Sequence, residues 1–396
     1  MKSIPRLFHN FSSLISAMLA IVSLNASAVE IQKKLNWQMW DVSILLPLPQ
    51  TSDEIDLLLN PQSQKDFGVL ISPRIIQELP VLVRREQNEN VFGSHLKVVG
   101  IRLDPCFQEG LAPKSCARQI RLIWQPITNQ NDQISTVDAA IHTFYELTAE
   151  QWSEFILQYE SLLQQSGRPV ETQLSIHPII LKEGMKGGLW TGLRKLILKY
   201  CGEKNITRIT TMAIEGGGDQ WTFSGFNITA NSVLPIVIPK VFGKGQTFMS
   251  AIPNSLDFMA TIMPINFSNL GLWFVDNSVI AKTKFPENDF KIWTEDLLKI
   301  ENPRIHNPGT VDCVSCHLSS NILSWQERNF SSWDWKSIKS KQAFASTQNL
   351  SNSTIKNSTS EQLRAFGYQD REARFSQRVV NETAVVLDWF VQKPQH

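Results

Sequence analysis

Two cysteines and a histidine near the C-terminal end of the chain have a spacing at which thiols and an imidazole can hold one cofactor together. Residues 313–317 read Cys-x-x-Cys-His. Residues three apart on a helical turn share a face, so Cys313 and Cys316 can both form thioethers with one edge of a porphyrin. His317 then presents its imidazole to the iron as the proximal ligand. The sequence therefore predicts one covalently attached haem c, held by these three residues.

Three other kinds of site use the same residue types. A structural zinc site takes four ligands, and no second close Cys/His pair accompanies this one. A thioredoxin-like redox pair normally follows a core strand, whereas residues 307–310 before the motif contain Pro and Gly and favour a loop. A plain disulfide between Cys313 and Cys316 would leave the adjacent His317 without a role. We favour haem, and keep zinc binding and thiol or disulfide chemistry as alternatives.

On these five residues the chain resembles c-type cytochromes. The resemblance implies a cytochrome c-like haem module over residues 287–396 and one-electron transfer to or from a periplasmic redox partner of unknown identity. The larger N-terminal region also resembles exported bacterial proteins, otherwise uncharacterised, that carry a single haem motif near the C-terminus. Two alternatives stay open for the function: an exported ligand- or partner-binding protein in which the haem is a sensor or a structural staple, and a peroxidase-like haem enzyme.

The sixth ligand of the iron is not evident from the residues after the motif. In the common single-haem pattern an axial methionine follows the histidine, but this chain has no methionine after residue 263, and the one histidine beyond the motif is His396. A ligand must therefore come from upstream, or the site is open or occupied by water. His306, eleven residues before His317, is the first candidate. The others are Met259, Met263, His142 and His177.

The first 28 residues have the pattern of a cleavable signal peptide. Lys2 and Arg6 give a positive start, an apolar run covers residues 14–24, and Ala26-Ser27-Ala28 is a small-residue cleavage site. We expect cleavage after Ala28 and a periplasmic or secreted protein. No later stretch is long and apolar enough to predict a transmembrane segment in the mature chain.

Export changes the expectation for the remaining cysteines, because disulfides persist in oxidising compartments. Cys106 and Cys116 lie at the ends of two predicted strands, and a disulfide between them would close the neck of a hairpin. Cys201 lies at the end of a predicted helix, and we expect it to be a small buried apolar residue.

Composition excludes several classes of protein and partner. The chain has 396 residues, of which 42% are hydrophobic, so it can bury a globular core. Lys and Arg number 38 against 37 Asp and Glu, a balance that gives no reason to expect a nucleic-acid partner.

Close to the motif, two further sets of residues have a plausible haem role beside an ordinary one. Three tryptophans and a phenylalanine either wall the haem or simply pack together, and two arginines either pair with haem carboxylates or lie at the surface; these are Trp325, Trp333, Trp335 and Phe330, and Arg304 and Arg328.

The order of predicted elements indicates an α+β fold: a layered sheet-and-helix domain over residues 29–286, with residues 29–90 as a β- and turn-rich subdomain, followed by the mostly helical and loop module. Thr148 with Gln151 reads as a capping box that opens a helix. Strands are expected at 95–103, 117–126, 173–181, 206–214 and 221–228, with 136–145 either strand or helix. Helices are expected at 149–166, 188–201, 287–300 and 372–391, a left-handed Gly202 after the second of these, and a solvated loop at 337–362.

Overall fold

The computed structural model describes residues 35–79, 95–108, 116–130, 133–169, 173–215, 220–236, 246–250, 286–355 and 363–392. Residues from Trp37 to His396 form one compact unit. It combines a large antiparallel sheet with helices, so the predicted α+β class is confirmed. The expected signal peptide, Met259, Met263 and His396 lie outside the described residues. The division expected at residue 286 stays a prediction.

The sheet has nine strands within the described part of the chain, and its main path runs β1-β4-β5-β7-β8-β9-β10, with β6 paired to β5 and β11 to β9. Every strand pair in it is antiparallel. The strands are β1 (Ser43–Leu45), β4 (Leu96–Phe107), β5 (Ala117–Gln130), β6 (Gln133–Thr136), β7 (Ala140–Leu147), β8 (Ile206–Glu215), β9 (Gln220–Ile228), β10 (Val233–Pro235) and β11 (Gln246–Ser250).

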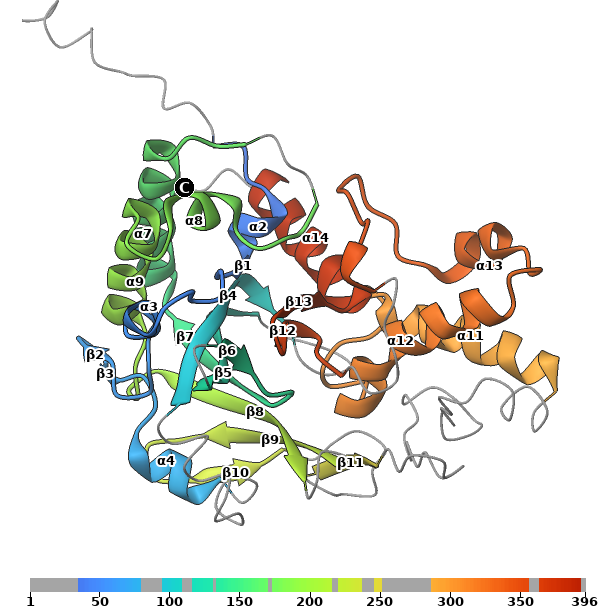
Figure 1. Cartoon of the computed structure of the whole chain (residues 1–396), viewed down its shortest axis with the longest axis horizontal. Helices are drawn as coiled ribbons and strands as arrows, with labels where there is room; N and C mark the ends of the chain where they lie inside the picture. The colour runs from blue at the N-terminus through green and yellow to red at the C-terminus, as the bar shows by residue number, and fades with distance from the viewer. Residues whose placement is uncertain are drawn as a thin grey trace, which may run out of the picture. The chain divides into compact units, whose positions relative to one another are not determined.

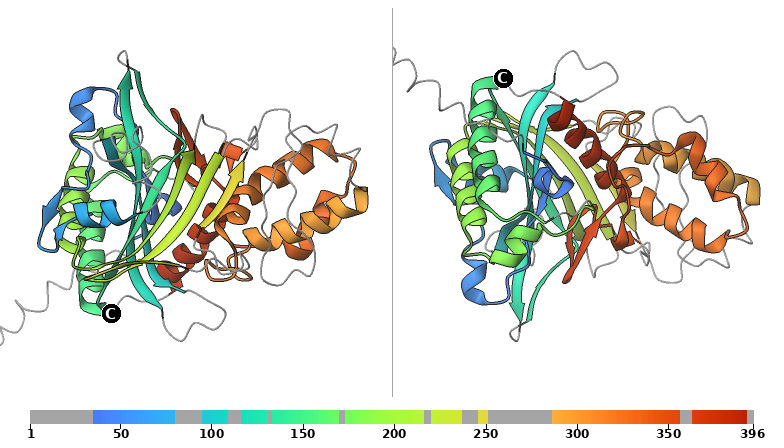
Figure 2. Two further views of the ribbon diagram at one scale, coloured as in Figure 1. Left: turned by 90° about the horizontal axis from the view of Figure 1, so that it is seen from below. Right: turned by 90° about the horizontal axis from the view of Figure 1, so that it is seen from above.

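One face of the sheet is covered by α7 (Ala149–Gln165) and α9 (Gly188–Tyr200), as Figure 2 shows. Ile120, Leu122 and Trp124 of β5, which share one face, are buried, and Ile123 and Gln125 on the other face are buried too, because both faces of the sheet are covered. The capping box is confirmed: the Thr148 hydroxyl accepts a hydrogen bond from Gln151 N, and the Gln151 side chain accepts one from Thr148 N. The cap satisfies backbone N–H groups that the first turn of α7 would otherwise leave unpaired.

The other face of the sheet carries the C-terminal elements (Figures 1 and 2). Gln125 on β5 bonds both to the carbonyl and to the N–H of Tyr368 on β12, at 2.7 Å each. Arg364 pairs with Asp138 at 2.9 Å. These contacts fix the last third of the chain against the sheet. Its elements are α11 (Glu287–Glu301), α12 (Cys313–Asn329), α13 (Trp335–Gln342), the 3-10 helix η2 (Ser353–Ile355), β12 (Phe366–Gln369), β13 (Glu372–Phe375) and α14 (Gln377–Gln392).

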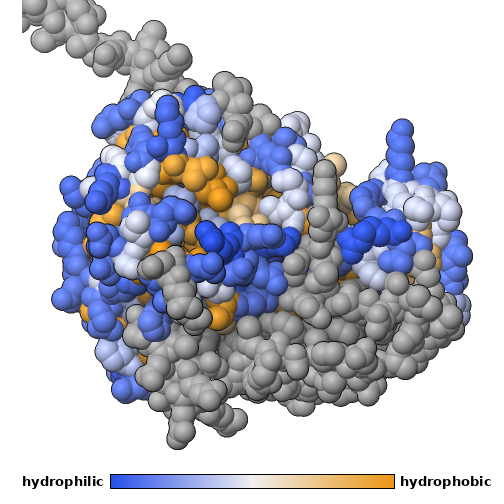
Figure 3. Space-filling view, viewed as in Figure 1, coloured by the Kyte–Doolittle hydropathy of each residue, from blue (hydrophilic) through white to orange (hydrophobic). Residues whose placement is uncertain are grey.

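Several short elements complete the described fold. They are α2 (Met39–Val42), α3 (Ser52–Ile55), β2 (Gln64–Lys65), β3 (Gly68–Val69), α4 (Pro73–Glu78) and α8 (Pro178–Glu183). In the described part of the chain no helix has both the length and the hydropathy to span a bilayer. Figure 3 shows a face that is mostly hydrophilic, with an apolar patch in the region where Figure 1 draws α8, whose Leu181 is 57% exposed.

Several sequence expectations were wrong in detail. The strand expected at 173–181 is one bridge from Ile176 to Leu45, followed by α8, because Pro178 suits the first turn of a helix. At 136–145, where strand and helix were both open, Thr136 ends β6 and Ala140 begins β7, with residues 137–139 in neither strand. β13 takes the first residues of the helix expected at 372–391. The loop expected at 337–362 contains the end of α13 and η2. Gly202 is not left-handed; a Cβ there would lie 2.4 Å from the Phe67 carbonyl oxygen, so the residue permits a close backbone approach.

The cysteines outside the motif are placed as expected. Cys106 and Cys116 form a disulfide between the end of β4 and the start of β5. Cys201 is a free, fully buried thiol, and burial raises its pKa well above the usual value. Such a thiol is unreactive and contributes packing.

Candidate functional site

The Cys-x-x-Cys-His motif forms the first turn of α12. Asp312 is the N-cap, and its side chain accepts a hydrogen bond from Ser315 N at 2.8 Å, which starts the helix at Cys313. Cys313 and Cys316 are one turn apart and are not joined in a disulfide. Both line one cavity together with His317. The turn that joint attachment requires is therefore present.

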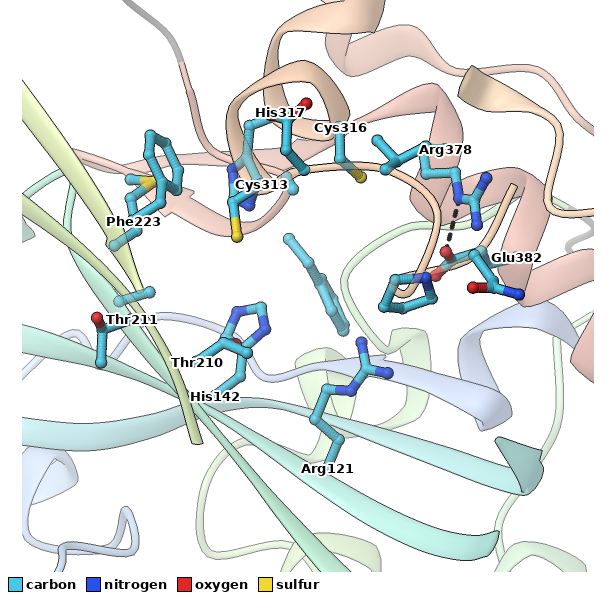
Figure 4. Close-up of a pocket in the computed structure, with 18 of the residues that line it drawn as sticks. Arg121, His142, Thr210, Thr211, Phe223, Cys313, Cys316, His317, Arg378 and Glu382 are labelled. Atoms are coloured by element: carbon cyan, nitrogen blue, oxygen red, sulfur yellow. Dashed lines mark hydrogen bonds and ion pairs between the residues drawn. The ribbon is translucent and has the colours of Figure 1, made fainter. Parts of the chain in front are cut away.

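The cavity lies between α12 and the sheet face opposite α7 and α9 (Figure 4). The empty space between its walls is about 940 Å³ when the solvent at its open mouth is included. A neighbouring cavity of about 1790 Å³ shares Cys316 and His317 with it. Apolar side chains form much of the wall, among them Phe107, Phe144, Met212, Phe223 and Phe366.

Two rows of side chains on one face of the sheet form this wall of the cavity. Each row runs across neighbouring strands and consists of directly paired residues. Directly paired residues in antiparallel strands point to the same face. One row runs across four strands and is rich in cations: Arg102, Arg121, Phe144 and Arg208. The next row on the same face is Gly100, Ile123, His142, Thr210 and Gly225. The register of β4, β5, β7 and β8 thus brings an imidazole and three arginines to the face that lies opposite α12.

His317 is oriented by a hydrogen bond to the backbone. Its Nδ1 lies 2.7 Å from the Leu363 carbonyl oxygen, and because a carbonyl only accepts, Nδ1 must carry the proton. The lone pair is then on Nε2. Metal-binding histidines usually have this arrangement, with the second ring nitrogen donating to a carbonyl or carboxylate. Burial also lowers the pKa of His317 to about 4, which keeps the ring neutral.

The two thiols are held in their protonated form. Burial, followed by the Asp312 carboxylate, raises the pKa of Cys313 to about 12. Burial likewise raises the pKa of Cys316 to about 12. Both values lie far above the range in which a cysteine is an active nucleophile at neutral pH. The pair therefore differs from the activated thiols of a redox site.

The walls carry more positive than negative charge. Glu382 on α14 pairs with Arg378 at 2.6 Å and with Arg102 at 3.6 Å. Burial opposes its ionisation, but Arg378, Arg102 and Arg121 outweigh burial and lower the pKa of Glu382 to about 2. Arg208, which is 8% exposed, also lines the cavity. The carboxylate of Glu382 thus interacts with Arg378, Arg102 and Arg121.

Arg121 is the cation with the clearest capacity for a further partner. Its guanidinium lies 4.5 Å above the Phe144 ring, and its buried Nε has no hydrogen-bond partner in the described part of the chain. Burial, and next the nearby Arg102, lowers the pKa of Arg121 to about 10, so the group is still charged at neutral pH. The donor set is suited to an anionic group such as a carboxylate.

The upstream histidines proposed as ligands lie in three different places. His142 on β7 lines both cavities, and Figure 4 shows it across the cavity from Cys313 and His317. His306 is buried, with Nδ1 3.2 Å from the Thr310 hydroxyl, and lines only the larger cavity. His177 caps α8, where Nδ1 accepts from Ile180 N, and lines neither cavity.

The aromatic and arginine residues singled out after the motif do not form the smaller cavity's wall. Trp325 and Phe330 instead pack with Phe290 of α11. Trp333 stacks on Phe330, and Trp335 stacks on Trp333. Ordinary packing is therefore the correct interpretation. Arg328 bonds to Ser324, whereas Arg304 borders the larger cavity and lies over the Phe344 ring.

The residues that sequence reasoning missed are Arg121, Arg208, Arg364 and Arg378, which line the smaller cavity, and Leu363, which orients His317. For Arg121 and Arg208 the sequence signal was an arginine within an apolar strand, whereas Arg364 lies outside the strands and Arg378 lies on α14. Within the described ranges no group of three or more His, Cys, Asp or Glu side chains is placed to hold a metal ion. A haem iron needs no such group, because the porphyrin supplies four of its ligands.

No protein-family model, curated protein or solved structure matches this chain.

Proposed function

We propose that the chain carries one covalently attached haem c, with Cys313 and Cys316 as the thioether residues and His317 as the proximal ligand, and that it transfers single electrons. The observation that carries the proposal is the His317 geometry: Nδ1 donates to Leu363, so Nε2 is available as a ligand, beside two thiols that line the same cavity. This combination suits haem better than zinc or thiol exchange.

The cavity walls fit the rest of such a group. Apolar side chains suit the porphyrin face, and Arg121 and Arg208 suit its carboxylates. The bound haem would supply the one-electron couple. The chain would set the reduction potential through the axial ligands, through burial, and through the positive charge of the arginines, which favours the reduced iron.

The proposal includes export to the periplasm and a redox partner there. It rests on the signal-peptide pattern of the sequence. A second function, as a sensor or a peroxidase-like enzyme, is favoured by one observation: the adjoining cavity shares His142, Cys316 and His317 with the first, which gives an external ligand a way to the motif.

Haem staining tests the attachment. The full chain is co-expressed with a cytochrome c maturation system and separated under denaturing conditions. The wild-type protein should retain the stain, because the thioethers are covalent, and the Cys313→Ala/Cys316→Ala protein should lose it. Cys201→Ala is the matched control, since this buried thiol lies outside the cavity, and it should stain like the wild type. A wild-type protein without covalent haem would return the motif to the zinc or thiol alternatives.

A further inference from the structure

The side of the cavity opposite His317 also contains an imidazole. We propose that His142 on β7 is the sixth ligand of the iron, so that the haem is held between α12 and the sheet by two histidines. This inference rests on the proposed function, because it needs the haem that Cys313 and Cys316 attach.

The register of the sheet places His142 on the correct wall. It pairs with Ile123 on β5 and with Thr210 on β8, and its side chain therefore lies on the face that α12 covers. The two axial ligands of a haem iron lie on opposite faces of the porphyrin. His317 comes from the helix and His142 from the sheet, with the cavity between them (Figure 4).

The ring of His142 also has no competing partner. Neither of its nitrogens makes a hydrogen bond or an ion pair with another group in the described part of the chain, although the residue is half-buried. Polar groups at such depth normally have a partner. A ring nitrogen that faces a cavity without one is available for a ligand bond.

The other described candidates are less suited. His177 lines neither cavity, and its Nδ1 accepts from Ile180 N. His306 lies in the segment that leads into α12, six residues before Asp312, and does not line the cavity that contains Cys313. His142, in contrast, lines the cavity that contains Cys313 and lies across it from the motif (Figure 4).

Absorption spectra of the purified holoprotein test the ligand. The wild-type iron should be low-spin in both oxidation states and insensitive to carbon monoxide, with no methionine–iron charge-transfer band. His142→Ala should retain the covalent haem, become high-spin and bind carbon monoxide. Added free imidazole should restore its low-spin spectrum. His306→Ala is the matched control and should have the wild-type spectrum.

His142→Met keeps the inference testable if the alanine protein does not fold. A methionine at this place should introduce the charge-transfer band that the wild type lacks. The inference is overturned if either His142 variant retains the wild-type spectrum, if His306→Ala is the variant that loses it, or if the wild-type haem is already high-spin. In all three cases the attached haem remains, and with it the first proposal. Absence of covalent haem from the wild type would instead remove both.

Discussion

His317 donates the hydrogen bond from its Nδ1–H to a backbone carbonyl and not to an ionisable side chain. The Leu363 carbonyl does not titrate, so the tautomer of the ring stays the same at any pH at which the ring is neutral. A carboxylate in this place would give the ring more negative character and favour the oxidised iron. At the residue scale, if haem is bound as proposed, the carbonyl would therefore favour a higher reduction potential of the iron than a carboxylate partner would.

Arg121 offers a test of the charged wall at the same scale. Arg121→Gln should lower the reduction potential of the haem, because it removes a positive charge that favours the reduced state. It should also lower the holoprotein's free energy of unfolding by about 1.5–3 kcal/mol, the value of one hydrogen bond to a charged group. Voltammetry and urea unfolding measure the two effects.

Arg118→Gln is the control for this prediction. Arg118 lies three residues earlier on β5, so its side chain is on the opposite sheet face. Its replacement should leave the potential unchanged. Equal potentials in wild type and Arg121→Gln would show that Arg121 is not near the haem carboxylates.

At the scale of elements, the β12–β13 hairpin positions the part of the cavity wall that comes directly after Leu363 in the sequence. Gly367 has a φ of +138°, and a Cβ there would lie 2.4 Å from Gln125 Oε1. Both the backbone conformation and the close approach to β5 therefore require glycine. The same Gln125 side chain holds Tyr368, so the hairpin and β5 are fixed at adjacent residues.

Gly367→Ala should destabilise the protein by about 1–3 kcal/mol, since it forces a side chain into a strained conformation and a filled space. The midpoint of urea unfolding measures this loss. Gly167→Ala is the matched control, because a Cβ there meets nothing within 4 Å, and it should leave the midpoint nearly unchanged. Equal midpoints for the two variants would show that Gly367 does not lie directly against Gln125 of β5.

The elements also show what the sequence could predict. The capping box at Thr148 and the helical turn of the motif were predictable because their signals lie within a few residues. The Glu372–Phe375 strand was not, since its residues continue the apolar spacing of the helix that follows and only pairing with β12 makes them a strand. Cys313, Cys316 and His317 likewise lie within a few residues of one another, so this half of the site was predictable from the sequence. His142, Arg121 and Arg208 meet only through cross-strand register, which no local pattern specifies.

For the molecule as a whole, the disulfide is a crosslink within the sheet that carries the site. Cys106→Ser/Cys116→Ser should reduce the free energy of unfolding by about 3 kcal/mol, the chain-entropy value for so short a loop. Urea unfolding measures the loss. Mass mapping without reduction should show Cys106 and Cys116 linked and Cys201 free to alkylate after unfolding. Linkage of Cys201 to either residue would contradict the hairpin assignment.

The burial of the two motif thiols has a consequence for the order of events in biosynthesis. In the folded chain Cys313 and Cys316 are half-buried and line the cavity between α12 and the sheet, so a group that reaches them there has to enter through the cavity mouth. The strands that cover them, from residue 96 to residue 228, are synthesised first. On the proposed function, haem attachment would therefore be easiest before α12 docks on the sheet.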